Sequence, residues 1–198
     1  MKTKQNIENG HEYVDLGLSV KWATCNVGAN KPEEYGEYFA WGETEPKGIY
    51  ALENYKWCND KYDALTKYNT SSSYGTVDNK TVLELADDVA HVKLGGSWRI
   101  PTNGEWRELL NNCEWETKKG INGFIVTSKI NGNYIFLPLA GFYGDGYLCF
   151  IGKTGEYWSS VLRDNLSLYA RSWTLSTEQI IGAGGIRYYG MSVRPVCE

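Results

Sequence analysis

The sequence predicts an α+β fold in which antiparallel sheets are joined by long loops and accompanied by two short helices. The chain has 198 residues and contains 22 Gly, 15 Tyr and 8 Trp. Glycines and aromatic rings in such numbers favour many short strands and tight turns, whereas long helices would need more Ala and Leu. One clear helix start and one clear hairpin turn complete the basis for this prediction.

The length of the chain fits one domain. A chain of this size can bury roughly 70% of the surface of its unfolded state, so it needs no disulfide or metal for stability. We expect residues 1–10 to be disordered or extended and residues 11–198 to form a single domain, because no repeat or linker divides them.

The first part of the domain is predicted to be strand and loop. Residues 11–42 combine apolar stretches with turns, and residues 38–42 alternate with a period of two. Residues 43–80 are polar but contain Tyr and Trp. This composition predicts a surface loop that packs on the domain. It does not favour a disordered segment, because such segments contain few aromatic residues.

Two short helices are predicted in the middle of the chain. The first lies within residues 81–91, and Gly95 and Gly96 end it. The second begins after Thr102, which forms a capping box with Glu105 three positions on. The apolar residues of this second helix recur at the spacing of one helix face, namely Trp106, Leu109, Leu110 and Cys113.

The rest of the chain is predicted to be β. Residues 124–129 and 133–139 flank Asn131-Gly132, a strong hairpin signal. The second of these stretches is almost continuously apolar, which predicts a central strand covered on both faces. Further short strands are expected within residues 156–160, 169–175 and 190–196. Trp158 and Trp173 are assigned to the core, with Ser172, Thr174 and Ser176 on the face opposite Trp173.

Charge and hydropathy exclude two classes of partner. The net charge is -4, from 20 basic and 24 acidic residues spread along the chain. No basic cluster suits a nucleic acid, and no apolar run approaches the length of a membrane span. Residues 1–10 lack the apolar core of a signal peptide, which indicates either that the protein is not exported by that route or that the sequence has been trimmed at its start.

Cysteines and histidines offer little for catalysis or metal binding. The five cysteines are widely spaced without a CxxC pair, so we interpret them as small buried hydrophobic residues; one or two disulfides would fit an extracellular protein. His11 and His91 are the only histidines, which excludes a three-histidine metal site. The pair Asp87-Asp88 is interpreted as solvated or capping. No cofactor is expected, and a Ca²⁺ site is left open.

Several motifs resemble one family. DLGLSVKWATCNVG (15–28), AWGETEPK (40–47), GGSWRIPTNGEW (95–106), LPLAGF (137–142), EYWSS (156–160) and SVRPV (192–196) occur in the order found in the Fibrobacter succinogenes major paralogous domain, a family abundant in gut Bacteroidetes. The resemblance covers about residues 11–198. It implies a C-type-lectin-like fold related to formylglycine-generating enzymes, which share the helix start around Arg99, Pro101 and Glu105.

The catalytic groups of those enzymes are missing. Formylglycine-generating enzymes use two neighbouring cysteines near the C-terminal end of the fold, whereas Cys149 and Cys197 are far apart in the sequence. Related sulfoxide synthases use a histidine cluster that this chain lacks. The resemblance therefore implies a binding domain that is not an enzyme. An enzyme of this type with other catalytic groups, and a structural component of a cell surface or virion, are the alternatives.

The tail is also similar in layout to the variable proteins of diversity-generating retroelements, whose exposed C-terminal loops are diversified to bind different ligands. This resemblance implies a protein or glycan ligand and a place on a cell surface or phage particle. Tyr, Arg, Asn and Asp suit such a surface, because they combine contact area with adaptable hydrogen bonds. The candidate binding residues are Tyr143, Asp145, Tyr147, Phe150, Arg163, Asp164, Asn165, Arg171, Ser172, Thr174, Tyr188 and Tyr189.

Overall fold

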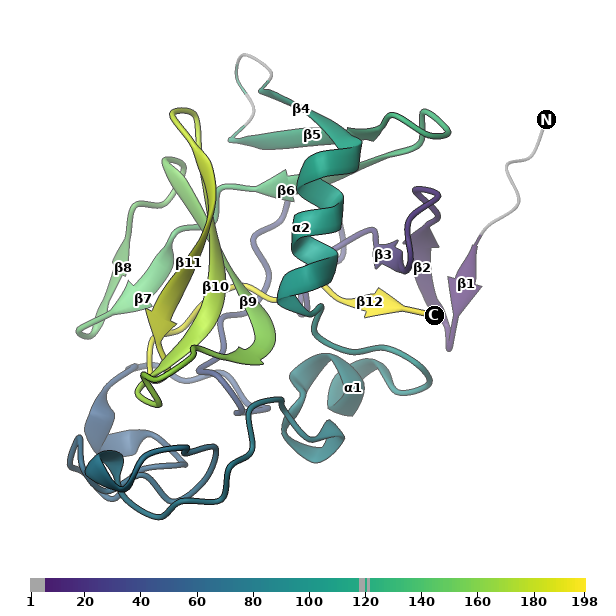
Figure 1. Cartoon of the computed structure of the whole chain (residues 1–198). Coiled ribbons are helices and arrows are strands. Elements are labelled where there is room, and N and C mark those ends of the chain that lie inside the picture. Colours follow the sequence, from purple (N-terminus) through teal and green to yellow (C-terminus); the bar gives the residue numbers. More distant parts are fainter. Residues whose placement is uncertain (1–5, 118–119, 121) are drawn as a thin grey trace.

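The computed structural model describes residues 6–117, 120 and 122–198. It confirms the α+β class: its sheets are mostly antiparallel, and the two α-helices are short (Figure 1). Among the described residues, no helix is long and apolar enough to cross a membrane.

The first sheet joins the two ends of the described chain. It consists of β1 (Ile7–Glu8), β2 (His11–Val14), β3 (Lys21–Ala23) and β12 (Val196–Cys197), in that order. Val196 pairs with Trp22 in an antiparallel register. Residues 7 and 8, which lie within the segment expected to be disordered or extended, are thus a strand of this sheet, whereas residues 1–5 lie outside the described residues.

The second sheet contains the predicted hairpin. Its strands β4 (Cys113–Thr117), β5 (Gly123–Ser128) and β6 (Tyr134–Pro138) lie in that order, and Gly132 of the turn has a φ of 74°. The prediction that residues 133–139 form a central strand is wrong, because β5 is the middle strand. Coverage on both faces is confirmed, since all of β6 after Tyr134 is buried.

The third sheet is formed by the tail. It consists of β9 (Thr154–Leu162), β10 (Tyr169–Ser176) and β11 (Ile180–Ile186), with β10 in the middle. Beside it lies a hairpin of β7 (Phe142–Gly144) and β8 (Tyr147–Cys149). The strand expected within residues 190–196 is reduced to β12 and to single bridges, in which Met191 pairs with Phe39 and Ser192 with Tyr157.

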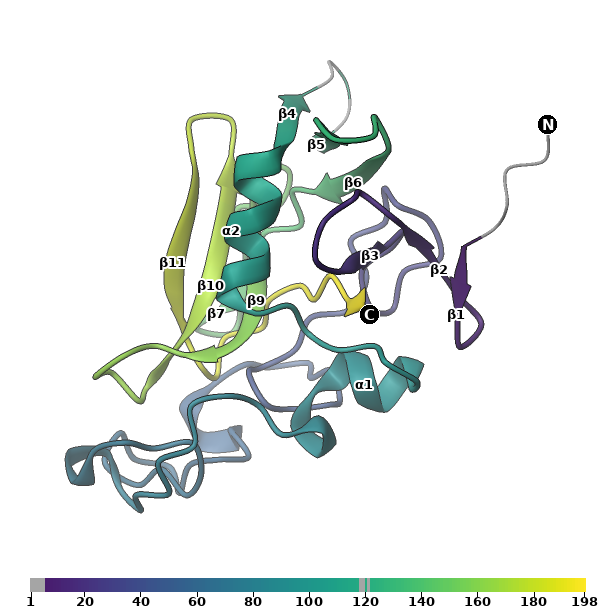
Figure 2. The ribbon, with the colours of Figure 1, turned by 45° about the vertical axis from the view of Figure 1, so that its right-hand side comes forward.

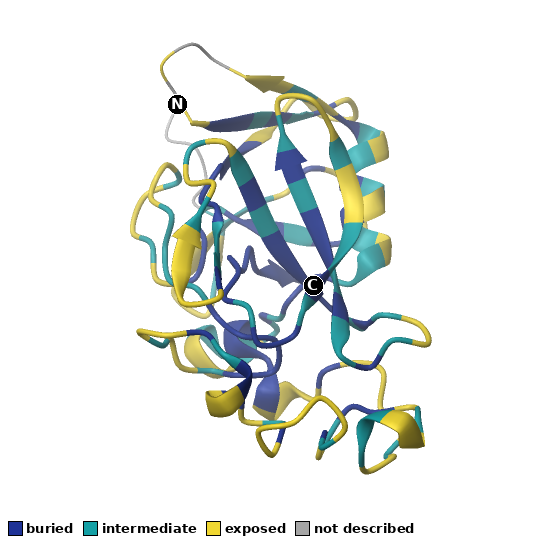
Figure 3. Cartoon of the chain, turned by 90° about the vertical axis from the view of Figure 1, so that its left-hand side faces the viewer, coloured by how far each residue is buried: buried dark blue, intermediate teal, exposed yellow. Residues whose placement is uncertain are grey.

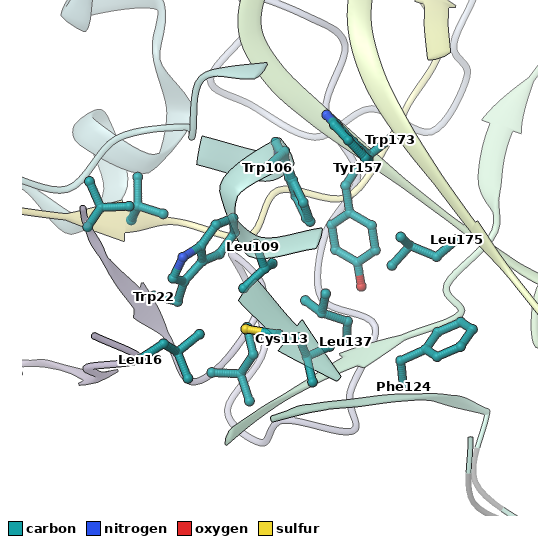
Figure 4. Close-up of a cluster of buried hydrophobic side chains, with 14 of the residues drawn as sticks. Leu16, Trp22, Trp106, Leu109, Cys113, Phe124, Leu137, Tyr157, Trp173 and Leu175 are labelled. Carbon is teal, nitrogen blue, oxygen red and sulfur yellow. The ribbon is translucent and has the colours of Figure 1, made fainter. Parts of the chain in front are cut away.

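Helix α2 (Asn103–Asn112) packs on the third sheet and closes the main core (Figure 2). The predicted capping box is confirmed, because the Glu105 amide donates to the Thr102 hydroxyl and the Thr102 amide donates to the Glu105 carboxylate. Trp106 lies between Trp22 and Trp173, with ring centroids 5.0 and 6.1 Å away (Figure 4). Trp158 and Trp173 are buried, as predicted.

Helix α1 (Val89–Leu94) begins later than the predicted helix within residues 81–91. A 3₁₀ turn at Leu85–Asp87 precedes it, and the side chain of Asp88 caps it by accepting hydrogen bonds from the amides of Ala90 and His91. The helix ends at Gly95, whose φ of 68° is in the left-handed region that favours glycine.

The segment 43–80 is a packed loop region, as its composition predicts. It contains two 3₁₀ turns, Leu52–Asn54 and Ser72–Tyr74, and surrounds a buried cluster that includes Tyr50 and Tyr55. All five cysteines are free thiols. Cys58, Cys113 and Cys197 are buried as predicted, whereas the other two are half-buried.

Candidate ligand-binding surface

The candidate residues of the tail fall into three places. One group belongs to the β7–β8 hairpin and to the segment that follows β11. A second group lies in the loop between β9 and β10, and a third lies within β10 itself. Figure 3 views the molecule from the side that carries β7, β8 and β11, where exposed loops surround partly buried strands.

The β7–β8 hairpin presents aromatic side chains to solvent. Its turn consists of Asp145 and Gly146, with φ of 51° and 82°, as the tightest two-residue hairpins require. Tyr147 is 75% exposed and Phe150 is 58% exposed. Phe150 also has a φ of 55°, which is uncommon for a bulky residue. Its ring stacks on Phe142, with centroids 6.0 Å apart.

The base of the hairpin is fixed by rings that do not face outward. Tyr143 is half-buried, and its ring lies 5.1 Å from that of Tyr38 and 5.3 Å from that of Tyr50. Tyr189 stacks on Phe142 at 5.6 Å. The prediction that the Tyr188 side chain is exposed is wrong. Only 8% of this residue is exposed, because it packs in the buried cluster around residues 50–65.

The loop between β9 and β10 carries charged candidates, and Arg171 of β10 lies beside them. The Arg171 guanidinium and the Asp164 carboxylate form an ion pair with a 2.6 Å N–O distance, and Asp164 is 77% exposed. The Arg163 guanidinium lies 5.8 Å from the centroid of the Tyr169 ring. Asn165 has a φ of 59°, a conformation that Asn tolerates better than most residues. Asp164 and Asn165 are exposed and the two arginines are half-buried, so these side chains form a polar edge.

The other two candidates on β10, Ser172 and Thr174, differ from each other. The prediction that Ser172 is exposed is wrong, because it is 1% exposed: a bulge between Ala170 and Ser172 places it opposite Trp158 in the register of β9. Thr174 is half-buried and donates a hydrogen bond of 2.7 Å to the Glu156 carboxylate. Burial raises the pKa of Glu156 to about 7, although this hydrogen bond opposes the rise.

A cavity of about 730 Å³ opens beside the hairpin turn. Its lining includes Leu52, Tyr62, Tyr74, Asp145 and Tyr188, so the tail supplies only part of it. The rest comes from residues 51–74, within the segment whose composition predicts a packed surface loop and not a part of the site. The signal for this part was the presence of Tyr among acidic residues in that segment.

Two buried arginines hold the tail in place. The Arg187 guanidinium donates to the backbone carbonyls of Lys67, Tyr68 and Ser167 and to the Tyr55 hydroxyl, at 2.9–3.1 Å. It thus ties the end of the third sheet to the loop region that forms the cavity.

Arg194 does the same for the last part of the chain. Its guanidinium donates to the Asn26 side chain and to the carbonyls of Ala23, Thr24 and Phe136, at 2.8–3.0 Å. Burial lowers the pKa of this guanidinium. The tail therefore rests on a framework in which the first and second sheets are cross-linked through one side chain.

The acidic pair singled out in the sequence has structural partners. Asp88 caps α1 and also accepts a hydrogen bond of 2.8 Å from the Ile100 amide. Asp87 accepts hydrogen bonds from Lys67 and Tyr68 at 2.6 and 2.7 Å. Across residues 6–117, 120 and 122–198, no three His, Cys, Asp or Glu side chains form a group suited to a metal ion.

Comparison with known proteins gives no relative: no protein-family model, curated protein or solved structure matches the chain.

Proposed function

We propose that this chain is a non-catalytic binding domain with a C-type-lectin-like fold, similar to the Fibrobacter succinogenes major paralogous domain, which recognises a protein or a glycan. The observation that carries the proposal is the β7–β8 hairpin, where Tyr147 and Phe150 are largely exposed above a base fixed by packed rings. Exposed aromatic side chains on a rigid support give contact area at low entropic cost.

The backbone of this hairpin supports the same proposal. Phe150 combines a positive φ with an exposed ring, an arrangement that costs stability without burying the side chain. An exposed aromatic residue with a positive φ is expected where the ring contributes to ligand binding and not to folding. The nearby Asp145 turn adds a carboxylate to the same surface.

The positions of the cysteines support binding over a formylglycine-generating type of catalysis. Cys149 ends β8, whereas Cys197 lies in β12 beside β3, in a different sheet. Burial raises the pKa of the Cys197 thiol to about 11, which keeps it in the unreactive neutral form near pH 7.

A direct test compares exposed aromatic residues on two hairpins. The whole chain is applied to a glycan array and used to select from a displayed protein library, and each ligand found is titrated against Tyr147→Ala, Phe150→Ala and Tyr134→Ala. Tyr134 is 62% exposed at the start of β6 and serves as the matched control. We expect the first two variants to lose at least about tenfold in affinity and the control to bind normally. Equal affinities in all three would contradict the proposal.

We further propose that the tail is diversified by a retroelement. The exposed candidates Asp145, Tyr147, Phe150, Asp164 and Asn165 are where substitutions can change a ligand surface without disturbing the core. Sequences of this tail from one population should vary at these positions and not at Ser172, which is buried. Uniform tails, together with a locus that lacks a reverse transcriptase and a template repeat, would remove this part of the proposal.

A further inference from the structure

The cavity beside the Asp145 turn is strongly acidic. Four carboxylates line it, from Glu53, Asp60, Asp63 and Asp145, against the single ammonium group of Lys61. All five residues are exposed, so they ring the opening. Their combined charge favours a positively charged occupant and repels an anion.

The walls of the cavity are aromatic. Tyr62, Tyr74 and Tyr188 line it together with Leu52. Leu52 and Tyr188 are buried, whereas Tyr62 is 58% exposed. Tyrosine rings attract ammonium and guanidinium groups through their faces. A ligand that makes cation–π contacts with the rings and ion pairs with the carboxylates is therefore an organic cation.

The cavity is already shaped before any ligand enters. The loop that carries Tyr62 is closed by hydrogen bonds from the Asn59 amide to the Ala64 carbonyl and from the Ala64 amide to the Lys61 carbonyl, both at 3.0 Å. On the other side, Tyr188 directly follows the buried Arg187. The volume of about 730 Å³ lies within the range of small-molecule sites.

We propose that this cavity binds an organic cation, with a guanidinium or ammonium group held between the tyrosine rings and the rim carboxylates. The cation comes either from a Lys or Arg side chain of a protein ligand or from a free amine. This inference rests on the proposed binding function and assigns the chemistry that one part of the surface recognises.

The experiment uses the whole chain and two matched probes. Binding of Nα-acetyl-arginine amide is measured by isothermal titration calorimetry and by NMR, beside the neutral isostere Nα-acetyl-citrulline amide. We expect saturable binding of the arginine probe, with a dissociation constant on the order of 1 mM for so small a ligand, and none of the citrulline probe. The affinity should fall severalfold as salt is raised from about 0.05 to 0.5 M, because salt screens the exposed carboxylates.

Variants localise the binding. Asp145→Asn keeps a residue type that tolerates positive φ, and Tyr62→Leu removes one ring; each should weaken the arginine probe about two- to fivefold. The control Glu178→Gln removes an exposed carboxylate outside the cavity and should leave the affinity unchanged. Circular dichroism establishes that each variant is folded.

A third probe, agmatine, which has no peptide backbone, tests whether the occupant is restricted to a free amine. Comparable binding of agmatine and the capped arginine supports a protein side chain or a free amine alike, and binding of agmatine alone restricts the occupant to a free amine. Equal binding of the citrulline probe, an unaltered affinity in both cavity variants, or no saturable binding of any cation would overturn the inference. A ligand from the array whose affinity still falls in Tyr147→Ala would then support the proposed function without this inference.

Discussion

The Nε of Arg187 and the hydroxyl of Tyr55 are hydrogen-bonded at 2.9 Å in the interior of the protein. This contact joins the end of the third sheet to the loop region 43–80. The guanidinium also lies 5.1 Å from the Trp41 ring and 5.3 Å from the Tyr55 ring. The stability of the domain is therefore expected to depend strongly on this one side chain.

Replacement of Arg187 by Leu should lower the free energy of unfolding by about 4 kcal/mol or more. The substitution leaves three buried oxygens and one partly buried oxygen without their donor, and each unsatisfied buried acceptor costs roughly 1–3 kcal/mol. Urea unfolding monitored by Trp fluorescence measures the change. The control is Arg171→Leu, which breaks only the exposed ion pair with Asp164 and should cost about 1 kcal/mol or less. Similar losses in the two variants would contradict the anchoring role of Arg187.

Replacement of Thr102 by Ala should destabilise the protein by about 1 kcal/mol, within a range of about 0.5–2 kcal/mol. The Thr102 hydroxyl accepts the Glu105 amide at the start of α2, and the methyl group of Ala cannot do so. Thr102→Ser retains the hydroxyl and should stay within about 0.5 kcal/mol of the wild type. Thermal unfolding of the three proteins tests this, and an equal loss with Ser would show that the hydrogen bond is not the cause.

Glu156 should make the protein less stable as the pH rises from about 4 to 7. Its pKa is raised to about 7 by burial, so in this interval the unfolded chain is ionised while the folded protein keeps the proton. The stability contributed by the neutral carboxyl is complete below the unfolded pKa of about 4.3 and is lost as the pH passes through the folded value. The difference between the folded and unfolded pKa corresponds to a loss of up to about 4 kcal/mol, at 1.36 kcal/mol for each pH unit.

The variant Glu156→Gln stays neutral and can still accept the hydrogen bond from Thr174. It should be more stable than the wild type at pH 8 and nearly equal to it at pH 4. Urea midpoints at several pH values measure the difference in stability between the two proteins. The contributions of all other titrating groups are the same in both proteins and cancel in this difference. The exposed Glu178→Gln serves as the charge-matched control. Parallel pH profiles of wild type and Glu156→Gln would refute the prediction.

Phe150→Gly should be more stable than Phe150→Ala by about 1 kcal/mol. A positive φ costs an L-residue roughly 1–2 kcal/mol, and Gly avoids this cost while the loss of the ring is common to both variants. The same pair at Tyr147, within β8, should show the opposite order, because Gly weakens an ordinary strand. Denaturant midpoints of the four variants measure the order of stability at each position. The same order at both positions would contradict the prediction.

Local sequence signals predicted the elements that local chemistry determines. The capping box at Thr102, the Asn131-Gly132 turn and the burial of Trp173 all follow from residues close together in the chain. Strand β11 was missed because its sequence IIGAGGI is rich in Gly and lacks the alternation that marks a strand; its pairing with β10 determines its conformation.

The candidate site was predicted only in part, because its geometry depends on contacts between distant segments. The exposed hairpin residues Tyr147 and Phe150 were identified from the tail alone. The burial of Ser172 depends on a bulge, and the cavity at Tyr188 depends on a loop more than 100 positions earlier in the sequence. Arg187 and Arg194 were overlooked as interior residues, since charged side chains are rarely fully buried.

The pairing of β12 with β3 has a consequence for biosynthesis. Because Val196 is the partner of Trp22, a nascent chain cannot complete its first sheet until nearly all of the described residues have left the ribosome. Until then the emerging polypeptide exposes the indole ring that later packs against Trp106. Contacts of such high sequence separation cannot form before both partners have been synthesised, so we expect folding to follow the synthesis of these residues and chaperones that bind hydrophobic segments to be engaged meanwhile.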